Sequence, residues 1–175
     1  MSVIRPEVSR RLMSEMRKLQ KAEMAGISIK SNFEDLTQIL AVIEGPENTP
    51  YENGEFLIKL EITNEYPQKP PKGYFLTKIF HPNIHPETGA ICLSLLSSDW
   101  TENTSFDHLL LAIRCLLIEP NPASALNEES GRLLLENYDD YFQRAKLMTE
   151  VYSKKEKSAA AHKKNIKAKK KLSRL

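Results

Sequence analysis

The chain has 175 residues, of which 41% are hydrophobic and 27% are charged, a composition typical of one soluble globular domain. No apolar run approaches the roughly 20 residues that a membrane-spanning helix needs, and the first residues lack the apolar stretch of a secretory signal. Two cysteines and four scattered histidines form neither a disulfide framework nor a metal cluster. We therefore expect an intracellular protein, cytoplasmic and nuclear, in which Cys92 or Cys115 is a candidate nucleophile.

The net charge of +2 is unevenly distributed along the chain. Residues 153–175 contain nine lysines, one arginine and one glutamate, a net charge of +9, which leaves −7 for residues 1–152. An acidic body followed by a basic tail indicates two functional units. We expect a folded domain over residues 1–152 and a lysine-rich tail over residues 153–175.

The spacing of apolar residues predicts the elements of the first half in chain order. Apolar residues recur at helical spacing from Pro6 to Glu23, and Gly26 is a stop signal for this helix. Alternating apolar residues then predict short strands, with Asn53-Gly54 as the turn before the third. The expected strands lie near residues 27–29, 36–43, 56–62 and 73–75.

The second half combines a long loop with helices. Residues 80–100 follow neither the helical nor the strand period, which indicates a functional loop. Helices are then predicted over residues 106–117, 128–136 and 138–152. Cys115 lies on an apolar face of the first of these, where we expect it to pack in the core. A helix, a run of antiparallel strands, a long loop and further helices make an α+β domain.

The loop carries a recognisable motif. Phe80 precedes His81-Pro82-Asn83, and a glycine at 89 leads to Cys92 in an aliphatic frame. This segment resembles the active-site signature of ubiquitin-conjugating enzymes. The resemblance extends over roughly residues 6–152, because further landmarks follow in order: Glu44-Gly45-Pro46, Tyr66-Pro67, Trp100 and Asn121-Pro122. One departure is an extra residue between the His-Pro-Asn motif and the cysteine, within residues 85–88.

This resemblance implies the ubiquitin-conjugating fold: an N-terminal helix, a four-stranded antiparallel meander, a long active-site loop and then three helices, as a catalytic domain over residues 1–152. It implies an enzyme that accepts ubiquitin as a thioester on Cys92 from the activating enzyme and transfers it to lysine. No cofactor is expected, since the activating enzyme consumes the ATP. A cysteine thiolate can accept an activated acyl group without a dedicated base. In an unknown fold, a lone cysteine beside Ile91 and Leu93 would equally fit a buried structural residue.

The motif residues around Cys92 have two kinds of expected role. Asn83 is expected to stabilise the oxyanion formed when lysine attacks the thioester. It also fits a structural role, holding the loop through hydrogen bonds to backbone, and the two roles are compatible. His81 and Pro82 are expected to be structural, with His81 a hydrogen-bonding residue rather than a base. His85 fits a solvated loop residue.

A carboxylate near Cys92 would help the attacking lysine to lose its proton. Many family members carry aspartates at the positions aligned with Ser94 and Ser124, but both are serine here. Glu128, at the start of a predicted helix, is therefore the candidate. Its alternative role is to favour the helix by its charge at the N-terminus.

Three longer stretches resemble the chain-elongating branch of the family, whose partner is the anaphase-promoting complex. They are residues 72–83, residues 127–138 and the tail ending Leu172-Ser173-Arg174-Leu175, although that branch usually has arginine at the position of Ser173 and a longer tail. We expect ubiquitin as donor and acceptor, and a ligase of this type docked by Leu172, Arg174 and Leu175. A passive tail is an alternative. Nucleic acid is disfavoured, since no aromatic residue follows Tyr152 for base stacking, and no membrane partner is expected.

Other readings of the family resemblance remain open. The chain would use identical chemistry to conjugate another ubiquitin-like modifier. A non-enzymatic ubiquitin-binding variant of the same fold would lack the cysteine, which stands in frame here. The generic ligase surface of the family, formed by the first helix and two loops, is expected to be weak, because Gln68 and Thr101-Glu102-Asn103 replace more usual residues. The helix with Cys115 is a further candidate contact for ubiquitin.

Overall fold

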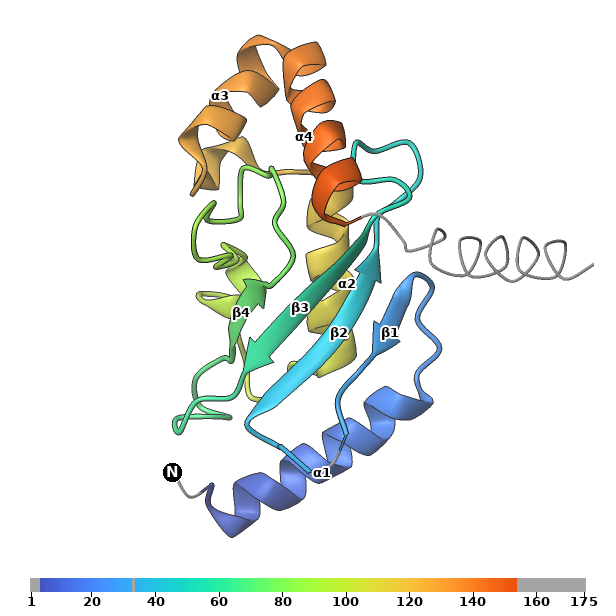
Figure 1. Ribbon diagram of the computed structural model, residues 1–175. Helices are drawn as coiled ribbons and strands as arrows, with labels where there is room; N and C mark the ends of the chain where they lie inside the picture. Colours follow the sequence, from blue (N-terminus) through green and yellow to red (C-terminus); the bar gives the residue numbers. More distant parts are fainter. Residues whose placement is uncertain (1–3, 33, 154–175) are drawn as a thin grey trace, which may run out of the picture.

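The structure, a computed structural model, describes residues 4–32 and 34–153. An antiparallel sheet lies at its centre, with α1 across one end of the molecule and α3 and α4 at the other (Figure 1). The expected roles of Leu172, Arg174 and Leu175 fall outside the described residues. Within this part of the chain, no helix is long and apolar enough to cross a membrane.

The sheet is a four-stranded meander in the order β1-β2-β3-β4, in which every neighbouring pair is antiparallel. Its strands are β1 (Ile27–Ile29), β2 (Gln38–Glu44), β3 (Glu55–Glu61) and β4 (Lys72–Phe75). In β2 and β3 buried residues alternate with half-buried ones, because successive side chains point to opposite faces. Asn53 has a φ of 65°, and asparagine tolerates this left-handed conformation in a turn. The predicted strands and their order are confirmed.

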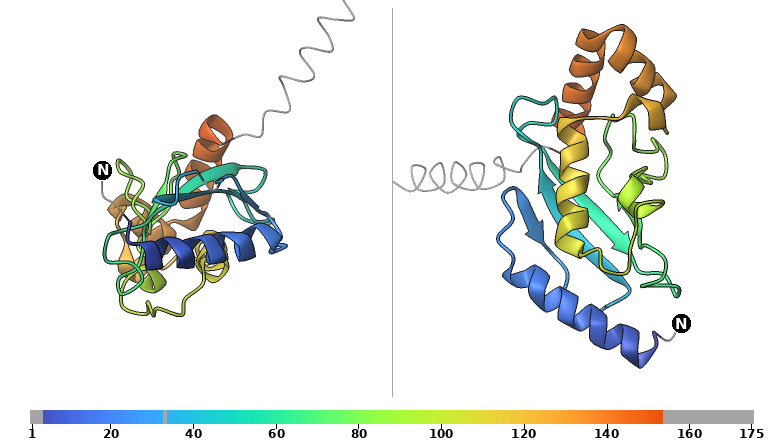
Figure 2. Two further views of the ribbon diagram at one scale, coloured as in Figure 1. Left: turned by 90° about the horizontal axis from the view of Figure 1, so that it is seen from below. Right: turned by 180° about the vertical axis from the view of Figure 1, so that it is seen from behind.

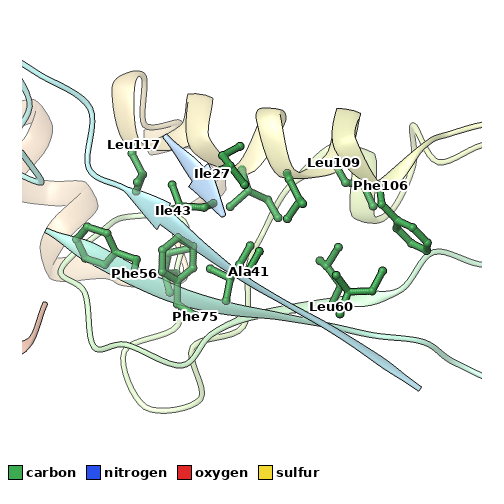
Figure 3. Close-up of a cluster of buried hydrophobic side chains, with 14 of the residues drawn as sticks. Ile27, Ala41, Ile43, Phe56, Leu60, Phe75, Phe106, Leu109 and Leu117 are labelled. Carbon is green, nitrogen blue, oxygen red and sulfur yellow. The ribbon is translucent and has the colours of Figure 1, made fainter. Parts of the chain in front are cut away.

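The core lies between the sheet and the helix α2 (Phe106–Ile118), which crosses one face of the sheet (Figure 2). Phe106, Leu109 and Leu117 of this helix meet Ile43, Phe56 and other strand residues in Figure 3. Every one of the five leucines and isoleucines that the sequence assigned to its apolar face is buried: Leu109, Leu110, Ile113, Leu116 and Leu117. The prediction for this helix is confirmed.

Helix α1 (Pro6–Lys21) closes one end of the core. Val8, Leu12, Met16 and Leu19 are its buried residues, so the helical spacing predicted the correct face. The helix ends two residues earlier than predicted, and Gly26, with a φ of 73°, lies in the turn that leads to β1.

Two helices, α3 (Glu128–Glu136) and α4 (Tyr138–Tyr152), form a hairpin at the other end. The end of α4 is fixed to the sheet, because the backbone amide of Glu55 donates to the carbonyl oxygen of Ser153 at 2.7 Å. Gly54 makes this contact possible, since a Cβ at Gly54 would lie 2.6 Å from both Ser153 Oγ and Thr149 Cγ2. Ser153, the last residue described, is therefore held beside β3.

Candidate active site

The loop between β4 and α2 is held to the sheet by backbone hydrogen bonds. The amide of Phe75 donates to the carbonyl oxygen of Gly89 at 2.8 Å, and the amide of Ile91 donates to that of Gly73 at 3.0 Å. Ile84 and Ile91 also form an isolated bridge. The predicted irregular loop is therefore ordered, with one 3-10 turn, η1 (Ser94–Leu96), that the sequence did not indicate.

Cys92 follows directly from these fixed residues. Its backbone amide donates to the carbonyl oxygen of Asn83 at 2.9 Å, which joins the two ends of the motif. The side chain is half-buried and forms no disulfide. A thiol that is held by its backbone and partly open to solvent can be approached by a reactant without moving the loop.

Asn83 is completely buried, with its side chain fully hydrogen-bonded. Its Nδ2 donates to the carbonyl oxygens of Asn121 at 2.7 Å and Ser124 at 3.1 Å. Its Oδ1 accepts from the amide of Asn121 at 2.9 Å. These contacts fix the 3-10 turn η2 (Pro122–Ser124) beside the active-site loop, as the structural role of Asn83 requires. For Asn83 to donate to an oxyanion, one of these two Nδ2 hydrogen bonds to a carbonyl oxygen would have to break.

His81 is also completely buried. Burial lowers its pKa to about 4, so the ring is neutral at neutral pH. Its Nδ1 accepts from the amide of Asn83 at 3.0 Å, and Nε2, which must then carry the proton, donates to the carbonyl oxygen of Leu116 at 2.7 Å. Nδ1 therefore bonds within the motif, and Nε2 joins the loop to α2. This is the arrangement that a structural, non-basic histidine would have.

Pro82 connects the motif to the start of α3. Its carbonyl oxygen accepts from the amides of Leu126 at 2.8 Å and Asn127 at 3.0 Å. Asn127 in turn caps α3, because its Oδ1 accepts from the amide of Ser130 at 3.1 Å. Glu128, the next residue, is exposed in the first turn of the helix. The structure thus brings the helix that carries Glu128 against the motif, while both of its expected roles stay predictions.

Two tyrosines support the loop from behind, a feature that the sequence did not reveal. The Tyr51 hydroxyl donates to the carbonyl oxygen of Phe80 at 2.7 Å, and the hydroxyls of Tyr51 and Tyr141 are 2.7 Å apart. Since a carbonyl can only accept, Tyr141 must donate to Tyr51. Burial raises the pKa of Tyr51 well above its ordinary value and that of Tyr141 to about 12, so both keep their protons.

The extra residue before Cys92 is absorbed in a tight turn. The amide of Gly89 donates to the carbonyl oxygen of His85 at 2.9 Å, and Gly89 has a φ of 74°. His85 Nδ1 accepts from the amides of Glu87 and Thr88, both at 3.2 Å. His85 is half-buried, and its hydrogen bonds organise the turn. Its interpretation as a solvated loop residue was therefore incomplete.

Cys115 does not pack in the core, and that prediction was wrong. The residue is exposed, as are Leu111 at 41% and Ile118 at 55%. These three residues are four and three positions apart, so they lie on one stripe of α2 that faces away from the sheet. The sequence assigned the five leucines and isoleucines of the apolar face correctly, but apolar residues occupy the opposite side of this helix as well, and Cys115 is one of them.

The three segments expected to form a ligase surface lie together. Arg11 of α1 lies over the ring of Tyr66, 5.8 Å from the centroid. Trp100 Nε1 donates to the carbonyl oxygen of Pro67 at 2.9 Å, which joins the loop of Gln68 to the loop that starts at Thr101. Gln68 and residues 101–103 are exposed, so these positions are open to a partner.

No group of three or more histidine, cysteine, aspartate or glutamate side chains is placed to hold a metal ion within residues 4–32 and 34–153.

Comparison with known proteins identifies the family. The family model described as ubiquitin-conjugating enzyme matches residues 11–149. The chain belongs to the ubiquitin-conjugating enzyme family. It is 49% identical to the ubiquitin-conjugating enzyme E2 S of Drosophila ananassae over 89% of this chain and 74% of the relative. Against the E2 S of Branchiostoma floridae it is 50% identical, over 85% of this chain and 70% of the relative.

A solved structure agrees with the family at the level of the fold. The E2 domain of a Toxoplasma gondii ubiquitin conjugating enzyme matches with a TM-score of 0.76 at 37% identity, covering 84% of this chain and 99% of that domain. The expected α+β ubiquitin-conjugating fold is confirmed, as is the resemblance to the E2 S branch. The chain is a ubiquitin-conjugating enzyme, a class that works with ubiquitin, an activating enzyme and ubiquitin ligases.

Proposed function

We propose that Cys92 carries ubiquitin as a thioester and that this enzyme elongates ubiquitin chains together with a multisubunit ligase of the anaphase-promoting-complex type. The observation that supports the first part is the position of Cys92, which is half-buried within a loop that three motif residues hold in place. The second part rests on the likeness to relatives named E2 S and on the lysine-rich tail.

The reaction has two acyl-transfer steps. In the first, the Cys92 thiolate attacks the carbonyl carbon of the ubiquitin thioester on the activating enzyme, and the activating enzyme's thiolate leaves. In the second, a deprotonated lysine amine attacks the carbonyl carbon on Cys92, and the Cys92 thiolate leaves as an isopeptide bond forms. The energy of both steps comes from the existing thioester, so the enzyme uses no cofactor of its own.

We assign Asn83 a role in the second step. Its carbonyl oxygen accepts from the amide of Cys92, so the residue lies against the nucleophile. Of its two Nδ2 contacts, that with Ser124 is the longer, at 3.1 Å against 2.7 Å for Asn121. We assign the oxyanion contact to the Nδ2 proton that bonds the carbonyl oxygen of Ser124. Once released, this carbonyl oxygen could accept a hydrogen bond from water instead.

Glu128 is the proposed proton acceptor for the incoming lysine. Its helix starts against Pro82, and its carboxylate is exposed, so an acceptor protein can reach it. The stripe of Leu111, Cys115 and Ile118 on α2 is the proposed contact for the donor ubiquitin. Exposed apolar residues in a row favour a protein partner at that place.

The tail is the proposed docking element for the ligase. Leu172, Arg174 and Leu175 would fill small pockets, and the lysines upstream would supply salt-sensitive attraction to an acidic surface. Its anchor at Ser153 would then tether the charged enzyme near the growing chain. Tethering raises the local concentration of the thioester without a new catalytic contact.

One experiment tests the modifier. The protein is mixed with ATP and with ubiquitin or another ubiquitin-like modifier, each with its own activating enzyme, and separated on a non-reducing gel. We expect a reducible adduct with ubiquitin alone. An adduct with a different modifier in preference to ubiquitin would make this chain a conjugating enzyme for that modifier, with the same chemistry on Cys92.

A further inference from the structure

Arg144 of α4 contacts the active-site loop and α3 at the same time. Its guanidinium carbon lies over the ring of Phe80, 5.5 Å from the ring centroid, and its Nη1 donates to a carboxylate oxygen of Glu129. Phe80 directly precedes the His81-Pro82-Asn83 motif. Glu129 directly follows Glu128, the proposed proton acceptor. One side chain therefore joins the start of the motif to the helix that carries this carboxylate.

Phe80 gives the guanidinium group a fixed surface. Its carbonyl oxygen accepts from the Tyr51 hydroxyl at 2.7 Å, and its ring centroid lies 6.3 Å from that of Tyr141. Tyr141 and Arg144 are three positions apart on α4, so they are neighbours on the surface of that helix. The aromatic ring and the cation of α4 thus contact the same residue of the loop, which sets the position of α4 against the motif.

The pairing with Glu129 sets the rotation of α3 about its axis. Pro82 and Asn127 accept from backbone amides at the start of this helix, so they fix where the helix begins. Arg144 adds a contact to a side chain of the first turn. Successive residues of an α-helix are turned by about 100° from one another, so holding Glu129 toward α4 also fixes the direction in which Glu128 points.

The contacts of Arg144 are better suited to positioning than to stabilising the fold. The side chains of Arg144 and Glu129 are 51% and 53% exposed, and an ion pair open to solvent adds little to the free energy of unfolding. Proton transfer is far more sensitive to geometry, because the base must lie within hydrogen-bond reach of the proton. A displacement of about 1 Å at a reacting group can cost on the order of a hundredfold in rate.

We infer that Arg144 is a positioning residue for the transfer step, which holds α3 against the motif so that the Glu128 carboxylate can take the proton of the incoming lysine. The inference rests on the proposed functions of Cys92 and Glu128. Arg144 acts through Glu128 alone and contacts neither the thioester nor the lysine. Charging of Cys92 involves no lysine, so it does not depend on this arrangement.

A double-mutant cycle in single-turnover discharge of preformed thioester to free lysine tests this role. Arg144→Gln should slow discharge about three- to ten-fold, the range that an exposed ion pair and a cation–π contact can hold in place. Its charging rate and its urea midpoint should match those of the wild type. In a Glu128→Gln background the same change should have no further effect, because the base that Arg144 positions is gone.

Two further variants separate positioning from a general loss of contacts. Arg144→Glu should also slow discharge, and the added change Glu129→Arg should recover part of the rate by restoring an ion pair of reversed sign. Lys59→Gln is the matched control, since Lys59 pairs with Glu61 at 3.2 Å and lies over the Tyr74 ring at 5.2 Å, and it should discharge like the wild type.

Three results overturn the inference: normal discharge by Arg144→Gln, losses that multiply in the double variant with Glu128→Gln, or no recovery in the charge-reversed pair. Failure of the proposed function gives different results. If the wild type forms no thioester, the function proposed for Cys92 is wrong. If Glu128→Gln alone discharges normally, the proposed proton acceptor is wrong, and the role of Arg144 with it.

Discussion

The backbone amide of Cys92 and the carbonyl oxygen of Asn83 are joined by a hydrogen bond of 2.9 Å. Nine residues apart in sequence, they bring the nucleophile and the only fully buried asparagine of the described chain together. The side chain of Asn83 extends the connection to Asn121 and Ser124. The active-site loop and the 3-10 turn η2 are thus joined through Asn83. A change at Asn83 is therefore expected to have both a structural and a chemical consequence.

Asn83→Ala should charge with ubiquitin almost normally but discharge to lysine on the order of a hundredfold more slowly, because the lost amide donor acts on the second oxyanion. Single-turnover discharge from preformed thioester measures this. Asn137→Ala is the control. It removes an asparagine side chain that also bonds to backbone, since Asn137 Oδ1 accepts from the amide of Asp140 at the start of α4, but it lies outside the motif. If charging fails while discharge from any thioester that forms is normal, the oxyanion role is wrong.

Glu128→Gln should slow chain formation and discharge to free lysine on the order of a hundredfold, the lower range of general base catalysis, because both need the amine to lose a proton, and it should leave charging nearly unchanged. Glu136→Gln, at the other end of the same helix, should have no such effect. The three rates are measured in parallel. Equal losses in all three would mean that Glu128 acts on the fold or the helix end.

Much of the fold could be predicted from the spacing of apolar residues in the sequence. The strands and α1 have polar residues between their apolar ones, so the spacing alone shows which face is buried. Helix α2 is apolar nearly all round, and the same method misplaced Cys115. The pairing of Tyr51 with Tyr141 joins residues 90 positions apart, which no local pattern can reveal. For Asn83, the sequence predicted hydrogen bonds to backbone as one of two compatible roles, but it could not identify their partners, Asn121 and Ser124.

The stability of the enzyme should depend on pH through His81. Its pKa is about 4 in the folded protein and near 6.5 in the unfolded chain, so the unfolded state binds the proton more strongly. The free energy of unfolding should therefore fall as pH decreases from 6.5 toward 4, by up to about 3 kcal/mol. Urea denaturation across this range measures the slope.

The control for this pH effect is a pair of variants. His81→Gln, which has no titrating ring, should flatten the slope between pH 6.5 and 4, while His108→Gln, at an exposed position, should keep it. A slope that is the same in the wild type and in His81→Gln would show that His81 is not the group responsible.

Deletion of residues 172–175 should preserve charging and ligase-free chain formation but raise the apparent KM for elongation with the ligase about ten-fold or more, because the tether is lost. Neutralising the lysines of the tail should chiefly slow association and reduce its dependence on salt. Elongation rates at varied ligase concentration measure both. An unchanged KM after the four-residue deletion would leave the tail as a solubilising appendage.

The central claim is the thioester on Cys92, and its most direct test is the chemistry of the adduct. With activating enzyme, ATP and ubiquitin, the wild type should form an adduct that thiol reductant removes. Cys92→Ser should form an oxyester that survives reductant, and Cys92→Ala should form no adduct. Cys115→Ser should still form an adduct that reductant removes, because Cys92 is intact. A Cys92→Ala protein that still charged normally would contradict the account.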